Sequence, residues 1–124
     1  MPRYFTTEQA NEALVVIKPM VAEILEIRQI ILEQQPDIWP SLQKAVGNGG
    51  SKAASQVALE FARMDTLVRQ IQASGALLKD LNIGLLDFPS LREGREVYLC
   101  WRYGEDSVQY WHDLDSGYAG RQKL

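Results

Sequence analysis

GLLDFPSLREGREVYLCWRYGEDSVQYWHDLDSGYAGR, residues 84–121, is the stretch that decides the fold of this chain. It holds seven of the eleven aromatic residues, the only histidine and the only cysteine. Residues 96–103 and 108–113 are rich in aromatic and apolar side chains, and the turn-forming sequence GEDS separates them. The pattern predicts a β-hairpin that carries most of the chemically distinctive side chains.

This hairpin presents two faces of different chemistry, because side chains alternate along a strand. With the turn centred on residues 105–106, Leu99 lies opposite His112. In this register the apolar face, which we assign to the core, holds Val97, Leu99, Trp101, Tyr103, Val108, Tyr110 and His112. The other face mixes aromatic side chains with charges of both signs and holds Glu96, Tyr98, Cys100, Arg102, Gln109, Trp111 and Asp113.

A long amphipathic helix is predicted near the start of the chain. FTTEQ, residues 5–9, is typical of a capping box, and apolar residues follow it at helical spacing over residues 7–35. Pro19 lies inside this pattern and predicts a kink or a break near residues 15–17. The apolar face is wide enough for two neighbours, one of which can be another subunit.

A second helix is predicted over residues 52–74. GNGG at residues 47–50 interrupts regular structure before it, and Ser51 is a plausible N-cap. Gly75 suits the left-handed position that ends many helices. A short helical piece is expected over residues 40–46, between the two long helices.

The periodicity changes from helical to extended after Gly75. We expect a hairpin region over about residues 76–113, whose first hairpin is closed by Pro89, and a C-terminal tail over residues 114–124. The predicted fold is a single α+β domain, residues 1–124. Two long antiparallel helices pack on a three- or four-stranded antiparallel β-sheet formed by the C-terminal third.

Composition excludes several classes of protein. Net charge is −3 with no Lys/Arg cluster, which argues against a protein that tracks nucleic-acid phosphates. A single cysteine excludes an internal disulfide and a zinc site based on cysteines of one chain. No signal core or membrane-length apolar stretch is present, so we expect a cytoplasmic protein that contacts no membrane.

The charged and aromatic face of the hairpin is the candidate binding site. Tyr98, Trp111 and Arg102 can stack on a planar ligand. Alternatively, Arg102 lies over Trp111 and pairs with Glu96, so that the cluster only stabilises the sheet. The same residue types are enriched in protein interfaces, which is a third reading.

The tail adds one more candidate binding residue, Arg121. Two glycines flank Tyr118 and allow the tail to fold back on the sheet. Arg121 can clamp a carboxylate or phosphate through two parallel hydrogen bonds. Alternatively, it pairs with an acidic residue of the domain, such as Asp87 or Asp115.

A divalent metal is the one cofactor that the sequence suggests. His112, Asp113, Asp115 and Asp87 supply nitrogen and oxygen ligands. His112 and Asp113 point to opposite sides of an ideal strand, so they can share a metal only where the strand ends or bulges. The alternative is a buried, hydrogen-bonded histidine beside an aspartate-rich turn.

Cys100 is a candidate nucleophile, with His112 as its base. In the predicted register the two side chains lie on opposite faces, which argues against direct contact. A buried cysteine that packs as a small hydrophobic residue is the alternative.

Several motifs together resemble a bacterial family of uncharacterised proteins, domain of unknown function 2203. They are FTTEQAN near the start, NGGSKAAS at residues 48–55, and GLLDFP, GREVYLCWR and YWHDLDSGYAGRQ in the last third. The resemblance spans nearly the whole chain. It implies a bacterial, cytosolic, stand-alone domain and transfers no activity, substrate or cofactor.

For function, the sequence favours an interaction module that uses the charged and aromatic hairpin face. The expected partners are a second copy of the chain, in a homo-oligomer, and an unidentified protein or small molecule. The alternative is a metal-assisted enzyme of hydrolase type with its site at residues 112–115. A third hypothesis assigns every candidate residue to packing alone.

Overall fold

The computed structural model of the protein describes residues 3–47 and 57–124. Within these ranges the α-helices are α1 (Thr7–Gln34), α2 (Trp39–Ala45) and α3 (Ala58–Ala73). The 3-10 helix η1 (Pro36–Ile38) lies between α1 and α2, and a second one, η3 (Tyr118–Gly120), lies near the C-terminus. The strands are β1 (Leu77–Asp80), β2 (Leu85–Arg92), β3 (Arg95–Arg102), β4 (Tyr110–Asp113) and β5 (Gln122–Lys123). The predicted α+β class is confirmed.

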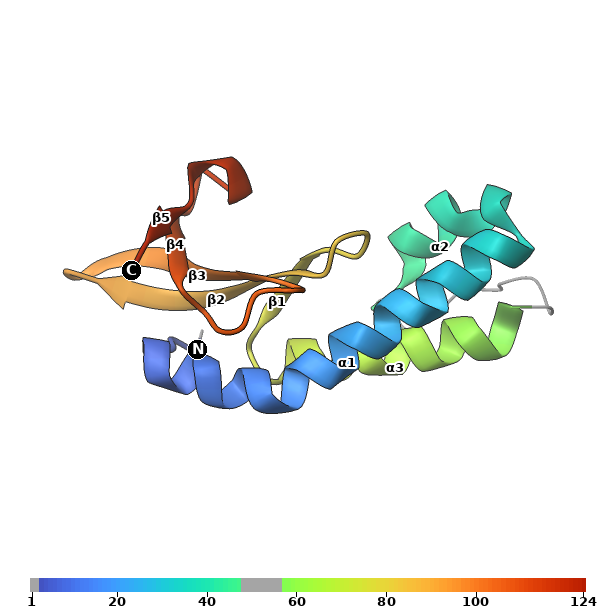
Figure 1. The fold of residues 1–124 in the computed structure, drawn as a ribbon, viewed down its shortest axis with the longest axis horizontal. Helices are drawn as coiled ribbons and strands as arrows, with labels where there is room; N and C mark the ends of the chain where they lie inside the picture. The colour runs from blue at the N-terminus through green and yellow to red at the C-terminus, as the bar shows by residue number, and fades with distance from the viewer. Residues whose placement is uncertain (1–2, 48–56) are drawn as a thin grey trace.

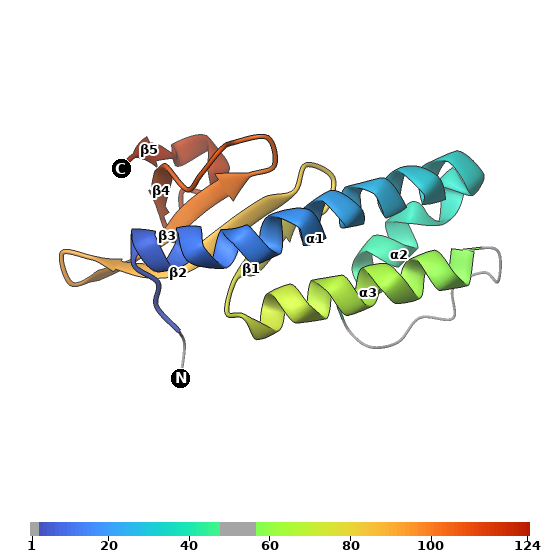
Figure 2. The same ribbon diagram turned by 60° about the horizontal axis from the view of Figure 1, so that its bottom comes forward.

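The molecule is elongated, with the sheet at one end and the helices extending toward the other (Figure 1). The first half of α1 lies along one side of the sheet, and its second half continues beyond the sheet beside α2 and α3. α3 runs antiparallel to α1, as predicted, and the C-terminal segment with η3 and β5 lies on the side of the sheet away from α1 (Figures 1 and 2). No helix of the described part is long and apolar enough to cross a membrane.

α1 begins with the predicted capping box. The amide of Gln9 donates to the Thr6 hydroxyl, and the Gln9 side chain accepts from the amide of Thr6. The helix continues through Pro19 to Gln34, so the structure excludes a break at residues 15–17. Its axis changes direction midway, as an internal proline favours (Figure 1).

α2 and α3 agree with the sequence where the structure describes them. α2 corresponds to the short helix expected over residues 40–46. α3 ends at Ala73, and Gly75 follows with a φ of 99°, in the left-handed region that only glycine adopts cheaply. The predicted start of this helix, with Ser51 as N-cap, lies outside the described residues.

The hydrophobic core lies between α1, α3 and one face of the sheet. α1 contributes Ala10, Leu14, Ile17, Val21, Ile24, Ile27 and Ile31, and α3 contributes Phe61, Met64, Leu67, Val68 and Ile71. The sheet contributes Leu86, Phe88, Val97, Leu99, Trp101 and Trp111. We call this face of the sheet the core face and the opposite one the outer face.

The sheet has five strands in the described residues rather than three or four. They follow chain order, and each neighbouring pair is antiparallel. The additional strand is β5, in the predicted tail, where Gln122 lies opposite Trp111 and Lys123 opposite Tyr110. A strand of two residues is too short to produce an alternating sequence pattern.

β2 is longer than predicted, because Pro89 does not end it. The strand continues to Arg92, and Pro89 lies opposite Tyr98 of β3. The Pro89 carbonyl accepts from the amide of Phe5, on the side where β1 no longer runs alongside. A residue of a strand directs its N and carbonyl to the same side, so the missing amide removes no bond to β3.

The turn between β3 and β4 does not form where the sequence analysis placed it. The amide of Tyr103 donates to the carbonyl of Gly84, and the amide of Val108 donates to the side chain of Asn11 in α1. These partners hold residues 103–109 in a wider connection. The predicted pairing of Leu99 with His112 is therefore wrong.

The consequence is a register shifted by one residue. Observed partners are Val97 and Asp113, Tyr98 and His112, Leu99 and Trp111, and Cys100 and Tyr110. Because side chains alternate, a shift of one residue exchanges the two faces of β4. Trp111, a predicted binding residue, enters the core face, and His112, predicted for the core face, moves to the outer face.

Candidate functional site

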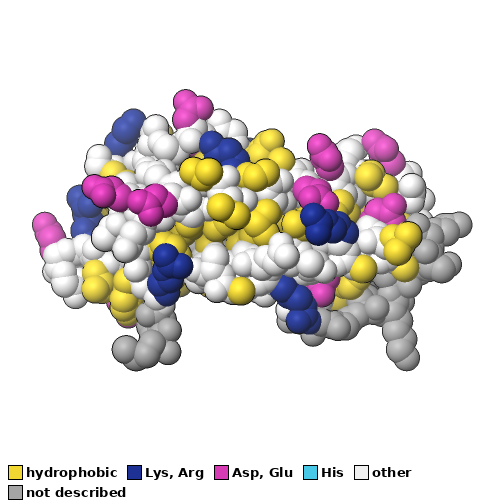
Figure 3. All heavy atoms as spheres, turned by 90° about the horizontal axis from the view of Figure 1, so that it is seen from below, with side chains coloured by type: hydrophobic (Ala, Val, Ile, Leu, Met, Phe, Trp, Pro, Cys, Tyr) yellow, Lys and Arg dark blue, Asp and Glu magenta, His cyan; other side chains and the backbone are white. Residues whose placement is uncertain are grey.

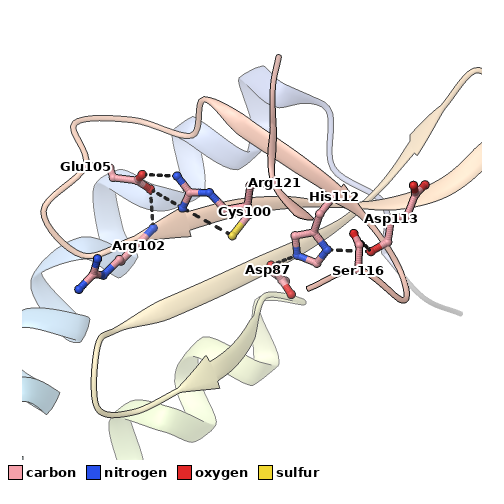
Figure 4. Close-up of polar contacts among 8 residues, drawn as sticks. All are labelled: Asp87, Cys100, Arg102, Glu105, His112, Asp113, Ser116 and Arg121. Atoms are coloured by element: carbon pink, nitrogen blue, oxygen red, sulfur yellow. Dashed lines mark hydrogen bonds and ion pairs between the residues drawn. The ribbon is translucent and has the colours of Figure 1, made fainter. Parts of the chain in front are cut away.

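Three buried polar side chains meet on the outer face of the sheet (Figure 4). Asp87 comes from β2, Cys100 from β3 and His112 from β4, and their ligand atoms all lie within 4.8 Å of one another. Their exposed fractions are 3%, 0% and 2%. Cys100 of β3 lies opposite Asp87 of β2 in the strand register, so adjacent strands hold this cluster in place. We refer to it as the Asp–Cys–His cluster.

His112 is held through both ring nitrogens. Nδ1 lies 2.8 Å from the carbonyl oxygen of Asp113, and Nε2 lies 2.9 Å from Oδ1 of Asp87. A carbonyl oxygen only accepts, so Nδ1 is the donor. One proton must then lie between Nε2 and the Asp87 carboxylate, whichever of them carries it. The buried pair therefore has no net charge.

Cys100 lies on the same face as His112, contrary to the predicted register. Burial, followed by the negative charge of Asp87, raises the pKa of the Cys100 thiol to about 12, against a smaller opposing effect of Arg121. A thiol that stays protonated at neutral pH is a poor nucleophile. The cluster does not support the nucleophilic role that the sequence suggested for Cys100.

Arg121 lies beside the cluster on the side of the C-terminal tail. Its guanidinium donates to both carboxylate oxygens of Glu105, at 3.2 and 2.5 Å, and lies 3.9 Å from Sγ of Cys100. It also stacks on the rings of Tyr110 and Tyr118. Its partner is thus Glu105 rather than Asp87 or Asp115, because the wide 103–109 connection brings Glu105 to the end of the tail.

The predicted metal ligands separate into two groups. His112 and Asp87 come together, but Asp113 directs its carboxylate to Arg95, 3.2 Å away, and contributes only its carbonyl to His112 (Figure 4). Asp115 is exposed on the segment after β4. Cys100, rather than Asp113 or Asp115, joins His112 and Asp87. The observed register of β4 places Cys100 and His112 on the same face, so the correct register would have predicted this group.

Trp111 and Arg102 do not form the predicted pair. Trp111 is buried, and the guanidinium groups of Arg92 and Arg95 lie 4.6 and 5.9 Å from its ring centre. Arg102 is exposed on the outer face, and its side chain points away from the cluster (Figure 4). Trp111 is thus covered by Arg92 and Arg95 rather than by Arg102, because the one-residue register shift moves Trp111 to the core face.

Glu96 and Tyr98, the two remaining candidates, line a recess of about 640 Å³ beside the cluster. The hydroxyl of Tyr4 hydrogen-bonds to Glu96, and this bond raises the pKa of Tyr4. The Tyr98 ring lies 5.5 Å from the His112 ring, with Lys79 Nζ 4.7 Å from its centre. Tyr98 therefore separates the recess from the Asp–Cys–His cluster.

These features define a class: a small α+β protein in which a helical pair supports an antiparallel meander with a buried polar cluster on its outer face. The chain belongs to the family described as Uncharacterized conserved protein (DUF2203), whose model matches residues 3–124. This match confirms the resemblance that the sequence motifs indicate. No curated protein and no solved structure matches the chain.

Proposed function

We propose that the protein is a binding module and that its ligand occupies the recess beside Glu96 and Tyr98. The observation that carries this proposal is that the recess combines an exposed carboxylate with an aromatic ring on adjacent outer-face positions of one strand. A concave site with a few polar groups on a largely apolar surface is the usual form of a small-molecule site. The strand fixes both side chains, so the site is preformed.

The lining of the recess indicates the chemistry of the ligand. Leu77, Pro89 and the Tyr98 ring supply an apolar surface, and Glu96, which accepts from Tyr4 through one oxygen, supplies a carboxylate. Arg3 also lines the recess, but its guanidinium donates to the Ser74 carbonyl and lies over the Phe5 ring. A flat apolar ligand body fits the apolar surface, and a cationic nitrogen of the ligand fits Glu96 through a charge-assisted hydrogen bond. An aromatic amine, free or on a partner protein, has both features.

Ligand-observed NMR tests this proposal with a library of small aromatic amines, aromatic carboxylates and neutral aromatics. We expect the amines to bind the wild-type protein and to bind Glu96→Gln about tenfold more weakly, because the charge-assisted bond is lost. Glu93→Gln is the matched control, since Glu93 lies in the exposed turn of the same hairpin. Equal binding of amines and carboxylates, or equal loss in both variants, would contradict the proposal.

We also propose that the chain self-associates through α1. Val15 and Val16 are 75% and 66% exposed in the first half of this helix, and Met20, one turn after Val16, is half-buried. Figure 3 shows hydrophobic side chains gathered in the middle of the face that α1 and α3 form. A contiguous apolar patch on a helix is typical of a protein interface, and a second copy of the chain can bury it symmetrically.

A further inference from the structure

We propose that Asp87, Cys100 and His112 form a binding site for a thiophilic divalent transition-metal ion, with Zn²⁺ as the reference ion. Three different donor atoms converge within 4.8 Å from three adjacent strands, and all three side chains are buried. This is the only such group of His, Cys, Asp and Glu side chains among residues 3–47 and 57–124. The site is separate from the recess and does not depend on it.

The geometry fits tetrahedral coordination. Zinc binds sulfur at about 2.3 Å and imidazole nitrogen at about 2.0 Å, so ligand atoms around one ion lie roughly 3 to 4 Å apart. The three donor atoms are within 4.8 Å already, and small side-chain rotations close the difference. The three strands supply three ligands, which leaves a fourth position for water or another small ligand.

The orientation of His112 supports the same conclusion. Metal-bound histidines usually donate their second ring nitrogen to a carbonyl or carboxylate, which fixes the ring. Nδ1 of His112 already donates to the carbonyl of Asp113, 2.8 Å away. Nε2 is then directed into the cluster, where it faces Asp87. The protein thus presents the nitrogen that would bind the ion.

Charge balance allows the ion to enter a buried site. Without metal, the cluster holds two protons: one on the Cys100 thiol and one shared by Asp87 and His112. A divalent ion that replaces both leaves a carboxylate, a thiolate and a neutral imidazole around it. The site has no net charge in either state, so metal binding adds no uncompensated buried charge.

The surroundings favour a thiolate in the metal-bound form. The Arg121 guanidinium, which Glu105 holds in place, directs a hydrogen-bond donor at Sγ from 3.9 Å. Thiolate and imidazole ligands select zinc, cobalt or copper over magnesium and calcium, which prefer oxygen. The alternative is a hydrogen-bonded network that only stabilises the sheet.

A cobalt titration separates these two readings. The full chain is stripped with a chelator after removal of any histidine tag, and Co²⁺ is added under anaerobic conditions. We expect one ion per chain and a thiolate-to-cobalt charge-transfer band that Zn²⁺ abolishes by displacement. Mg²⁺ and Ca²⁺ should not displace the cobalt.

Variants locate the site. Cys100→Ala should remove the charge-transfer band and weaken binding by more than about tenfold, and it should fold because alanine fills the place of a small buried group. Asp115→Asn is the control, because Asp115 is exposed, and it should bind as the wild type does. Absence of binding, an unchanged affinity in Cys100→Ala, or a loss in the control would overturn the proposal. Amine binding in the recess is measured on metal-free protein, so the two proposals fail separately.

Discussion

At the scale of single residues, the outer face of the sheet is characterised by contacts among its buried polar side chains. Asp87, His112 and Cys100 are buried, and each has a polar neighbour within the cluster. Every buried side-chain nitrogen and oxygen of the described residues has a hydrogen-bond partner. The cluster therefore contains no buried nitrogen or oxygen without a partner, and the protonation of Cys100 should affect the stability of the fold.

Alkaline pH provides a test of the Cys100 environment. Burial raises the pKa of the thiol from 9.0 to about 12 in the folded protein, whereas the unfolded chain titrates near the ordinary value. Unfolding therefore releases a proton between these values, and the stabilisation present below pH 9 is lost as the pH rises toward 12. We expect the unfolding free energy of metal-free protein to fall more steeply above pH 9 than that of Cys100→Ala.

Urea unfolding from pH 8 to 11 in the presence of a chelator measures this difference. Thiol labelling supplies an independent reading, since the native protein should react slowly with an alkylating reagent and the denatured protein rapidly. Parallel pH profiles in the two proteins, together with fast labelling of the native state, would contradict this account of Cys100.

At the scale of elements, the contact between α1 and the sheet depends on one glycine. Gly84 starts the path into β2 with a φ of 68°, and its backbone lies against Val21 of α1 and Tyr103. A Cβ at this position would meet the Val21 side chain at 2.8 Å and the Tyr103 Cβ at 2.9 Å. The helix can approach the sheet this closely only because residue 84 has no side chain.

Gly84→Ala should consequently destabilise the protein strongly. It combines left-handed backbone strain with overpacking, for a loss of about 3 kcal/mol in unfolding free energy. Gly94→Ala is the matched control: Gly94 has a φ of 78°, but no atom lies within 4 Å of an added Cβ. It should lose only about 1 kcal/mol. Chemical denaturation of both variants tests this, and equal losses would exclude a role for the close approach.

At the scale of the whole molecule, the second half of α1, α2 and the first part of α3 lie beyond the sheet (Figures 1 and 2). The molecule therefore exposes more helix surface than a helical pair fully covered by a sheet would. Leu59 at the start of α3, which is 83% exposed, lies on this surface, whereas the exposed valines of α1 lie in the half of the helix beside the sheet.

We expect the wild-type protein to form a dimer through the first half of α1. Light scattering coupled to gel filtration should report twice the 14.0 kDa of one chain. Val16→Glu should shift the protein to a single chain, because a buried charge without a partner disfavours association. Leu59→Glu, at a more exposed apolar position on α3, should leave the dimer intact. A wild-type mass of one chain would end the proposal.

The sequence determined the parts of this protein that depend on local chemistry. Thr6 and Gln9 predict the start of α1, and Gly75 predicts the end of α3. The aromatic run at residues 96–103 predicts β3. Helical periodicity and the change to extended pattern after Gly75 then give the α+β class. Each of these features rests on neighbouring residues, so no tertiary contact was needed to predict it.

The tertiary structure decided the register of β4 and, with it, the candidate site. Asn11 of α1 holds Val108, and Gly84 holds Tyr103, so contacts far apart in the sequence widen the connection before β4. This one-residue shift moves Trp111 into the core and brings His112 to Asp87 and Cys100. Side chains alternate with a period of two along each strand. The sequence pattern can therefore predict both strands correctly without determining their register, and the register decides which residues of the two strands share a face.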